Sequence, residues 1–160
     1  PGRTGVDLRP ETVARLAAHP RIGGIKEASG NVRRMLDLVA QTPSDFVVLC
    51  GDDDIVVPAI AAGARGLISV ASNALPRAMG TIVRHARAGD FATARADLLP
   101  LLPFIDALFV EANPIPVKAA LAMQGRISDT VRLPLLSATA PLRERMAPFL
   151  LMSSRLGVSA

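Results

Sequence analysis

Short apolar runs alternate with amphipathic helical patterns along the first half of the chain. Three of these runs lack a strict apolar–polar alternation, which predicts strands buried on both faces, over residues 22–25, 46–50 and 66–70. Helical spacing of apolar residues predicts helices over residues 10–18, 31–42, 52–62 and 74–88. Helices that alternate with strands in this way indicate an α/β fold with a parallel sheet built from right-handed βα units.

The ends of the predicted helices carry suitable capping residues. Asn31 is a favourable N-cap, and Asp52 or Asp53 can begin the next helix, which Gly63 ends. The helix after Asn31 is predicted to place on one face the apolar residues Val32, Met35, Leu36 and Val39.

Strand patterns stop after Gly89. The remaining patterns predict helices over residues 90–111, interrupted by Pro100 and Pro103, and over residues 117–124 and 141–156. Three strands cannot close a parallel barrel, and a (β/α)8 barrel typically has about 250 residues. Residues 1–89 are therefore either a small α/β sheet or the latter part of such a barrel. Residues 90–160 are predicted to form a helical extension.

Lys26 is the strongest candidate for chemistry because it ends the first predicted strand. It is one of only two lysines, whereas arginine supplies the other positive charges. A lysine that is desolvated at the end of a buried strand can lose its proton and attack a carbonyl to form a Schiff base, which arginine cannot do. The alternative is an ordinary strand-end lysine paired with Glu27.

The loops after the other predicted strands also carry candidate residues. Gly51 would let the backbone approach a ligand closely. The acidic run at residues 52–54 could bind a hard cation, although such runs more often cap a helix. Ser69, Ser72 and Asn73 are either donors to a substrate or another helix cap. Arg3 lies in a Gly-Arg-Thr-Gly loop and could bind a substrate carboxylate in a bidentate manner, or be a solvated turn residue.

Composition argues against several other classes of protein. The net charge is +4, but the arginines are scattered and no tyrosine or tryptophan is present to stack on bases, so no nucleic-acid partner is predicted. The single Cys50 is expected to be a buried core thiol. His19 and His85 lie far apart, which predicts no metal site. No signal peptide and no membrane-spanning run is visible, so the protein is predicted to be cytoplasmic.

Several motifs together resemble the dihydrodipicolinate synthase and N-acetylneuraminate lyase family. They occur in the family's order, with similar spacing, up to about Leu135: Pro1-Gly-Arg-Thr-Gly5, Gly24-Ile-Lys-Glu-Ala-Ser-Gly-Asn31, Gly51-Asp-Asp53, Gly66-Leu-Ile-Ser-Val70, Asn113-Pro-Ile-Pro-Val-Lys118 and Arg132-Leu-Pro-Leu135. The resemblance implies the C-terminal part of a (β/α)8 barrel, with about three strands, followed by a helical extension. Pro1 is turn-like and is not a methionine, which is consistent with a fragment, a processed product or an incomplete gene model.

The resemblance also implies a reaction and its substrates. Lys26 would form the Schiff base with pyruvate, and Arg3 would bind the carboxylate of aspartate semialdehyde. The backbone at Gly51 and the carbonyl of Ile68 would line the pocket. The expected product is 4-hydroxy-tetrahydrodipicolinate in the diaminopimelate route to lysine, made without a metal or cofactor by a homo-oligomer.

The chain departs from the family pattern in its proton relay. The family uses two tyrosines and a threonine from a Gly-Thr-Thr-Gly-Glu motif, whereas this chain has no tyrosine and lacks that motif. We therefore expect the chain alone to be inactive. Two alternatives stay open: an aldolase of the same family that acts on 2-keto-3-deoxy-sugar acids, which the Arg3 loop disfavours, and a non-catalytic half-barrel that needs a partner.

Overall fold

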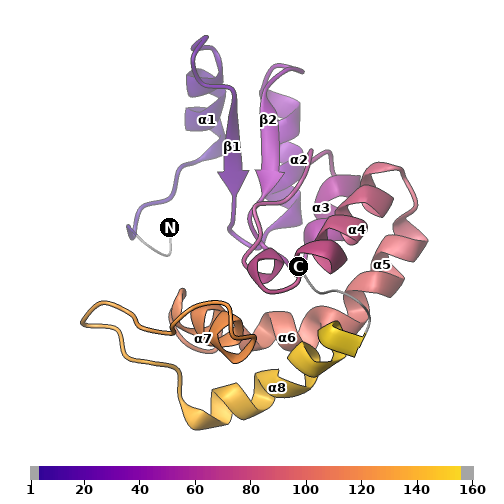
Figure 1. Ribbon diagram of the computed structural model, residues 1–160. Helices are drawn as coiled ribbons and strands as arrows, with labels where there is room; N and C mark the ends of the chain where they lie inside the picture. Colours follow the sequence, from indigo (N-terminus) through magenta and orange to yellow (C-terminus); the bar gives the residue numbers. More distant parts are fainter. Residues whose placement is uncertain (1–3, 156–160) are drawn as a thin grey trace. The chain divides into compact units, whose positions relative to one another are not determined.

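The computed structural model describes residues 4–155, with side chains from residue 4 to residue 150. Two parallel strands, β1 (Gly24–Glu27) and β2 (Val47–Cys50), pair with Gly24 opposite Val47 and Glu27 opposite Cys50. Figure 1 shows the two arrows running in the same direction. The first two predicted strands are therefore confirmed, with β1 shifted by two residues so that Lys26 lies within it.

The third predicted strand, over residues 66–70, is reduced to one parallel bridge between Cys50 and Leu67. Two backbone hydrogen bonds flank this bridge, from Arg65 N to Val48 O and from Ile68 N to Cys50 O, each of 2.8 Å. Val70 already has a helical backbone conformation and precedes the 3-10 helix η1 (Ala71–Asn73). The prediction was wrong in length because the pairing ends near Ile68 and the backbone is already helical at Val70.

Helices α1 (Pro10–Ala17), α2 (Val32–Gln41) and α3 (Val56–Ala61) accompany the strands. The N-cap prediction for α2 is confirmed, because the Asn31 side chain accepts a hydrogen bond of 3.3 Å from the backbone N–H of Arg34. Its predicted apolar face was partly wrong: α2 buries Met35 and Leu38, and it exposes Leu36 and Val39. The N-cap residue of α3 is Ile55, and not Asp52 or Asp53 as predicted.

Alternation along the strands gives the sheet two different faces. One face belongs to the core, where Ile25, Val48 and Cys50 pack with Val13 of α1 and Met35 of α2. The other face carries Gly24 and Lys26 of β1, and both residues are exposed to solvent. The helices thus cover one side of β1 and leave the Lys26 side open. The prediction of a strand buried on both faces, with a desolvated lysine at its end, is therefore wrong for β1 as this chain presents it.

Beyond the bridge at Leu67, the regular secondary structure of the described residues is helical. It contains α4 (Pro76–Arg87), α5 (Phe91–Leu98), η2 (Leu99–Leu101), α6 (Leu102–Ala107), α7 (Ile115–Met123) and α8 (Ala140–Arg155). The predicted helix at 90–111 divides at Pro100 and Pro103, as expected from residues that lack a backbone N–H. No helix within residues 4–155 is long and apolar enough to cross a membrane.

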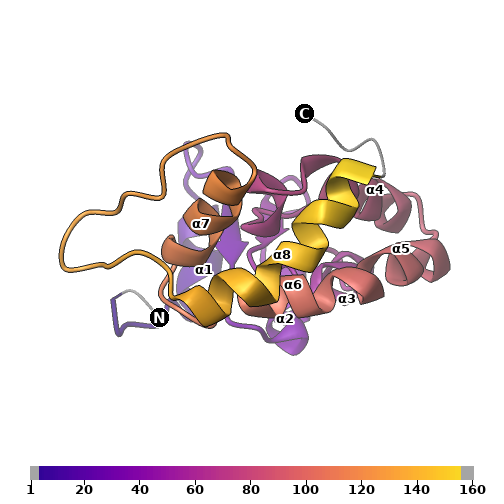
Figure 2. The ribbon, with the colours of Figure 1, turned by 60° about the horizontal axis from the view of Figure 1, so that its bottom comes forward.

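Contacts group the chain into two compact units. The first comprises residues 1–68 and 83–94, and the second comprises residues 69–82 and 95–160. In the second unit α8 packs along α6 and α7, as Figure 2 shows, and the rings of Phe104 and Phe149 lie 5.9 Å apart. The division predicted after Gly89, between a partial barrel and a helical extension, stays a prediction.

Candidate functional site

Three of the predicted site positions lie side by side at the C-terminal ends of the extended segments. The backbone N–H of Gly51 donates a hydrogen bond of 2.7 Å to the carbonyl of Glu27, the residue after Lys26. The N–H of Ile68 donates one of 2.8 Å to the carbonyl of Cys50, the residue before Gly51. The structure therefore places Lys26, Gly51 and Ile68 at one edge. Arg3 lies outside the described residues.

The side chain of Lys26 passes close to Gly51. A Cβ atom at position 51 would be only 2.5 Å from Cε of Lys26 and 2.6 Å from Cβ of Ala28. Carbon atoms in van der Waals contact are about 3.5–4.0 Å apart, so glycine is the residue that leaves this space free. The sequence predicted a close approach between Gly51 and a ligand, and the structure shows a close approach between Gly51 and the candidate nucleophile.

Glu27 turns away from Lys26 into the covered side of β1, and it is buried. One carboxylate oxygen accepts a hydrogen bond of 2.7 Å from the backbone N–H of Ser29. The other lies 2.9 Å from Nε of Arg34 in an ion pair. The alternative in which Glu27 pairs with Lys26 is therefore wrong, since both oxygens of Glu27 have other partners and the two side chains lie on opposite faces.

Asp52, the first residue of the acidic run after β2, connects two loops. Oδ2 of Asp52 accepts a hydrogen bond of 2.9 Å from the N–H of Gly30, which ties this loop to the one after β1. Burial raises the pKa of the Asp52 carboxyl, and nearby Asp54 and Glu27 act in the same direction. Asp53 is fully buried. Within the described part of the chain, no cluster of three or more His, Cys, Asp or Glu residues could hold a metal ion.

Cys50 is fully buried, which confirms that it is a core thiol. Its sulfur lies 3.2 Å from the carbonyl oxygen of Asp52, to which the thiol donates. Burial raises the pKa of this thiol from 9.0 to about 11, so the reactive thiolate is scarce at neutral pH.

Ser69 and Asn73 make local contacts in the second unit. The Ser69 hydroxyl oxygen accepts a hydrogen bond of 2.7 Å from the N–H of Ser72. The Asn73 side chain donates one of 3.0 Å to the carbonyl of Val70. These contacts favour the capping interpretation over donors to a substrate.

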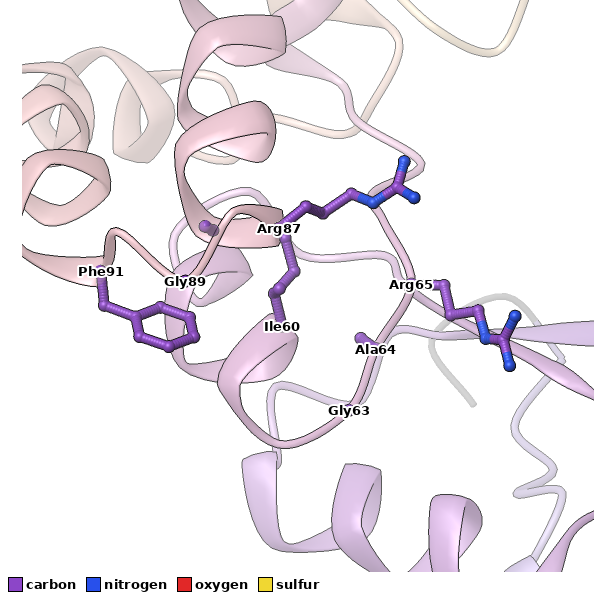
Figure 3. Close-up of a pocket in the computed structure, with 8 residues that line it drawn as sticks. Ile60, Gly63, Ala64, Arg65, Arg87, Gly89 and Phe91 are labelled. Atoms are coloured by element: carbon purple, nitrogen blue, oxygen red, sulfur yellow. The ribbon is translucent and has the colours of Figure 1, made fainter. Parts of the chain in front are cut away.

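A surface pocket of about 320 Å³ lies in the first unit, away from Lys26. Figure 3 shows the Phe91 ring on one side of this pocket and the guanidinium groups of Arg65 and Arg87 on the other. Arg65 donates a hydrogen bond of 2.5 Å to the carbonyl of Ser44. None of the predicted site residues lines the pocket.

The sequence did not reveal the role of Arg34 in α2. Its guanidinium contacts Glu27 beside Lys26 and also Asp7, in the segment that follows Arg3. An arginine in an amphipathic helix gives no signal for such a contact, because its partners are 7 and 27 residues away in the sequence.

Comparison with known proteins identifies the family to which these strand ends belong. A model of the dihydrodipicolinate synthetase family matches residues 1–151. The chain belongs to this family.

Similar curated proteins of the dihydrodipicolinate synthetase family include two 4-hydroxy-tetrahydrodipicolinate synthases. The one from Syntrophus aciditrophicus is 49% identical over 146 residues, which are 91% of this chain and 50% of that protein. The one from Exiguobacterium sp. is 51% identical over 142 residues, which are 88% of this chain and 48% of that protein. The chain thus spans about half the length of the curated relatives that it matches.

Solved structures of dihydrodipicolinate synthases have the same fold as this chain. The enzyme from Thermotoga maritima matches with a TM-score of 0.91 and 41% identity, over 96% of this chain and 54% of that one. The enzyme from Aquifex aeolicus matches with a TM-score of 0.92 and 36% identity, over 96% of this chain and 53% of that one. These likenesses confirm the predicted fold class, which is part of a (β/α)8 barrel with a helical extension.

Proposed function

We propose that this chain supplies the Schiff-base lysine and part of the substrate site of a 4-hydroxy-tetrahydrodipicolinate synthase. The observation that carries the proposal is the position of Lys26. It lies in β1 within the Gly-Ile-Lys-Glu-Ala-Ser-Gly motif, on the open face of the sheet, with Gly51 directly beside its side chain. The complete protein would condense pyruvate with aspartate semialdehyde in lysine biosynthesis. A relative from Acinetobacter baumannii, which is 39% identical, has been solved in complex with pyruvate.

The proposed reaction follows from the chemistry of a primary amine. The neutral Nζ of Lys26 attacks the keto carbon of pyruvate, and loss of water gives an imine. Removal of a proton from the neighbouring methyl group gives an enamine, whose carbon attacks the aldehyde of the second substrate. The amine of that substrate then displaces Lys26 from the imine and closes the ring, so the net loss is one water. The imine itself is the electron sink, so the reaction requires no metal or cofactor.

The other site positions have distinct proposed roles. Gly51 leaves room for Lys26, and the backbone at Gly51 and the carbonyl of Ile68 line the pocket. Arg3 binds the carboxylate of aspartate semialdehyde, for which a planar guanidinium offers two parallel donors. The proton transfers need positioned acid–base groups, which are worth about 10²- to 10⁴-fold in rate. Because this chain contains no tyrosine, we propose that those groups lie outside it. We also propose that the active form of the complete protein is a homo-oligomer in the cytoplasm.

Product formation by the complete protein tests the proposed function. Purified protein is given pyruvate with either aspartate semialdehyde or a sugar-derived aldehyde, and the products are identified by mass spectrometry. We expect 4-hydroxy-tetrahydrodipicolinate with the first pair. A preference for the sugar-derived aldehyde would instead assign the protein to the aldolases of the same family.

A further inference from the structure

Arg34 joins three groups that belong to two different segments. Its Nη1 donates a hydrogen bond of 2.7 Å to Oδ2 of Asp7, and its Nη2 donates one to the carbonyl of Leu8. Its Nε lies 2.9 Å from the buried carboxylate of Glu27. The side chains of Arg34 and Glu27 are only 16% and 6% exposed, whereas that of Asp7 is 44% exposed, so the contact is shielded from solvent on the Glu27 side only. Each nitrogen of one guanidinium group therefore has a different partner.

This geometry fixes the partners relative to one another. A guanidinium is planar and rigid, so groups bound to its three nitrogens are held at set positions, which the flexible ammonium of a lysine cannot reproduce. The hydrogen bond to Arg34 lowers the pKa of the Asp7 carboxyl, and the same bond raises the pKa of Arg34. Both groups thus stay charged across the neutral range, and the contact persists there.

Each of the two segments joined by Arg34 lies next in the sequence to a residue with a proposed role in the reaction. Glu27 directly follows Lys26 in β1, and Asp7 and Leu8 belong to the segment that follows Arg3. Arg34 therefore fixes Asp7, which comes four residues after Arg3 in the sequence, against α2 and β1.

We propose that Arg34 is a positioning residue for the aldehyde half of the reaction, because it holds the segment after Arg3 against the strand that carries Lys26. The proposal rests on the proposed function, in which Arg3 binds the aldehyde's carboxylate. Loss of Arg34 removes the contacts of Asp7 and Leu8, in the segment that follows Arg3, while Lys26 and Gly51 make no contact through Arg34. The addition of the aldehyde then suffers, and imine formation with pyruvate does not.

The test compares variants of the complete protein. Arg34→Ala removes all three contacts, and Arg34→Lys keeps the charge without the planar guanidinium group. Asp7→Ala removes only the carboxylate that accepts from Nη1. Arg33→Ala is the matched control: Arg33 is the neighbouring arginine in α2, and its ion pair of 3.0 Å with Asp37 is exposed. Pyruvate imine formation is followed by borohydride trapping, and kcat/KM is measured for aspartate semialdehyde and for a similar aldehyde without a carboxylate.

Arg34→Ala and Asp7→Ala are expected to lower kcat/KM for aspartate semialdehyde by about tenfold or more, the loss typical of a charged hydrogen bond. Arg34→Lys should not restore it, while Arg33→Ala should match the parent protein. The aldehyde without a carboxylate should be affected less, and combining Arg34→Ala with Arg3→Ala should add little to Arg3→Ala alone. Two results would overturn the proposal. One is an equal loss in the rate of imine trapping and in kcat/KM for both aldehydes, and the other is additive effects of Arg34→Ala and Arg3→Ala.

A readout independent of activity separates this proposal from the proposed function. Hydrogen exchange in peptides covering residues 4–13 and 27–31 should accelerate in Arg34→Ala and stay unchanged in Arg33→Ala. If the parent protein traps no pyruvate, the proposed function fails, whereas the exchange result still reports the tie between the two segments. Unchanged exchange in Arg34→Ala would show that Arg34 does not hold the segment after Arg3.

Discussion

Replacing Gly51 by alanine should harm both stability and imine formation, because the new methyl group has no space. It would lie 2.5 Å from Cε of Lys26 and 2.6 Å from Cβ of Ala28. Both contacts are about 1 Å shorter than van der Waals contact. The Lys26 side chain can bend away, whereas Cβ of Ala28 moves only with its backbone. We expect the substitution to destabilise the protein by about 1–3 kcal/mol, as overpacking does.

The displacement of Lys26 should be visible in its chemistry. A shift of about 1 Å in a positioned reacting group can cost on the order of 100-fold in rate. In Gly51→Ala, we therefore expect borohydride trapping of pyruvate on Lys26 to slow by about 10- to 100-fold. Trapping is followed by the mass of the labelled peptide, and stability is followed by denaturant unfolding of the same preparation.

Gly23→Ala is the matched control, because a methyl group at position 23 would have no heavy atom within 4 Å and the backbone there is not left-handed. This change should alter stability by less than about 0.5 kcal/mol and leave trapping unchanged. In a Lys26→Ala background, the stability cost of Gly51→Ala should fall, since one of its two clashes is gone. If Gly51→Ala keeps the parent's stability and trapping rate, the packing of Gly51 against Lys26 is not what positions the lysine.

Three further predictions concern Arg3, Cys50 and the chain by itself. Arg3→Ala in the complete protein should lower kcat/KM for aspartate semialdehyde by about tenfold or more while pyruvate trapping changes little; equal losses would indicate a structural role. Burial raises the pKa of Cys50 from its ordinary 9.0 to about 11, so the thiol ionises more readily in the unfolded chain. The stabilisation from keeping this thiol protonated is therefore complete below pH 9 and is lost as the pH rises through 11. Unfolding of Cys50→Ala should lack this alkaline loss, and an identical pH profile would contradict the shift. The purified 160-residue chain should self-associate in sedimentation and be inactive, because among the described residues β1 pairs on one edge only; a monomer that turns over at about 1 s⁻¹ or faster would refute this.

Local signals in the sequence were sufficient for much of the fold. Asn31 predicted the start of α2, and the prolines at 100 and 103 predicted where the long helical pattern divides. The apolar runs predicted three parallel strands, of which two form, and the C-terminal ends of these two bring Lys26 and Gly51 to one edge. These features depend on residues close together in the chain or on a general property of parallel sheets.

Features set by distant contacts could not be predicted. The run at residues 66–70 has the composition of a strand, but only the part beside Cys50 finds a pairing partner before the chain turns. The buried face of α2 depends on how the helix meets β2, so Leu38 is buried where Leu36 was expected. The contact of Arg34 with Glu27 and Asp7 likewise arises only when three segments come together.

The most direct test of the proposed function is the site of pyruvate attachment. The chain contains two lysines, Lys26 and Lys118, so borohydride reduction of the complete protein with pyruvate, followed by peptide mass mapping, distinguishes them. Lys118 contacts the carbonyl of Thr130 in the second unit and has no proposed catalytic role. We expect the mass of reduced pyruvate on the peptide that contains Lys26, and its loss in Lys26→Ala. Label on Lys118, or no label on either lysine, would contradict the assignment of Lys26 as the Schiff-base residue.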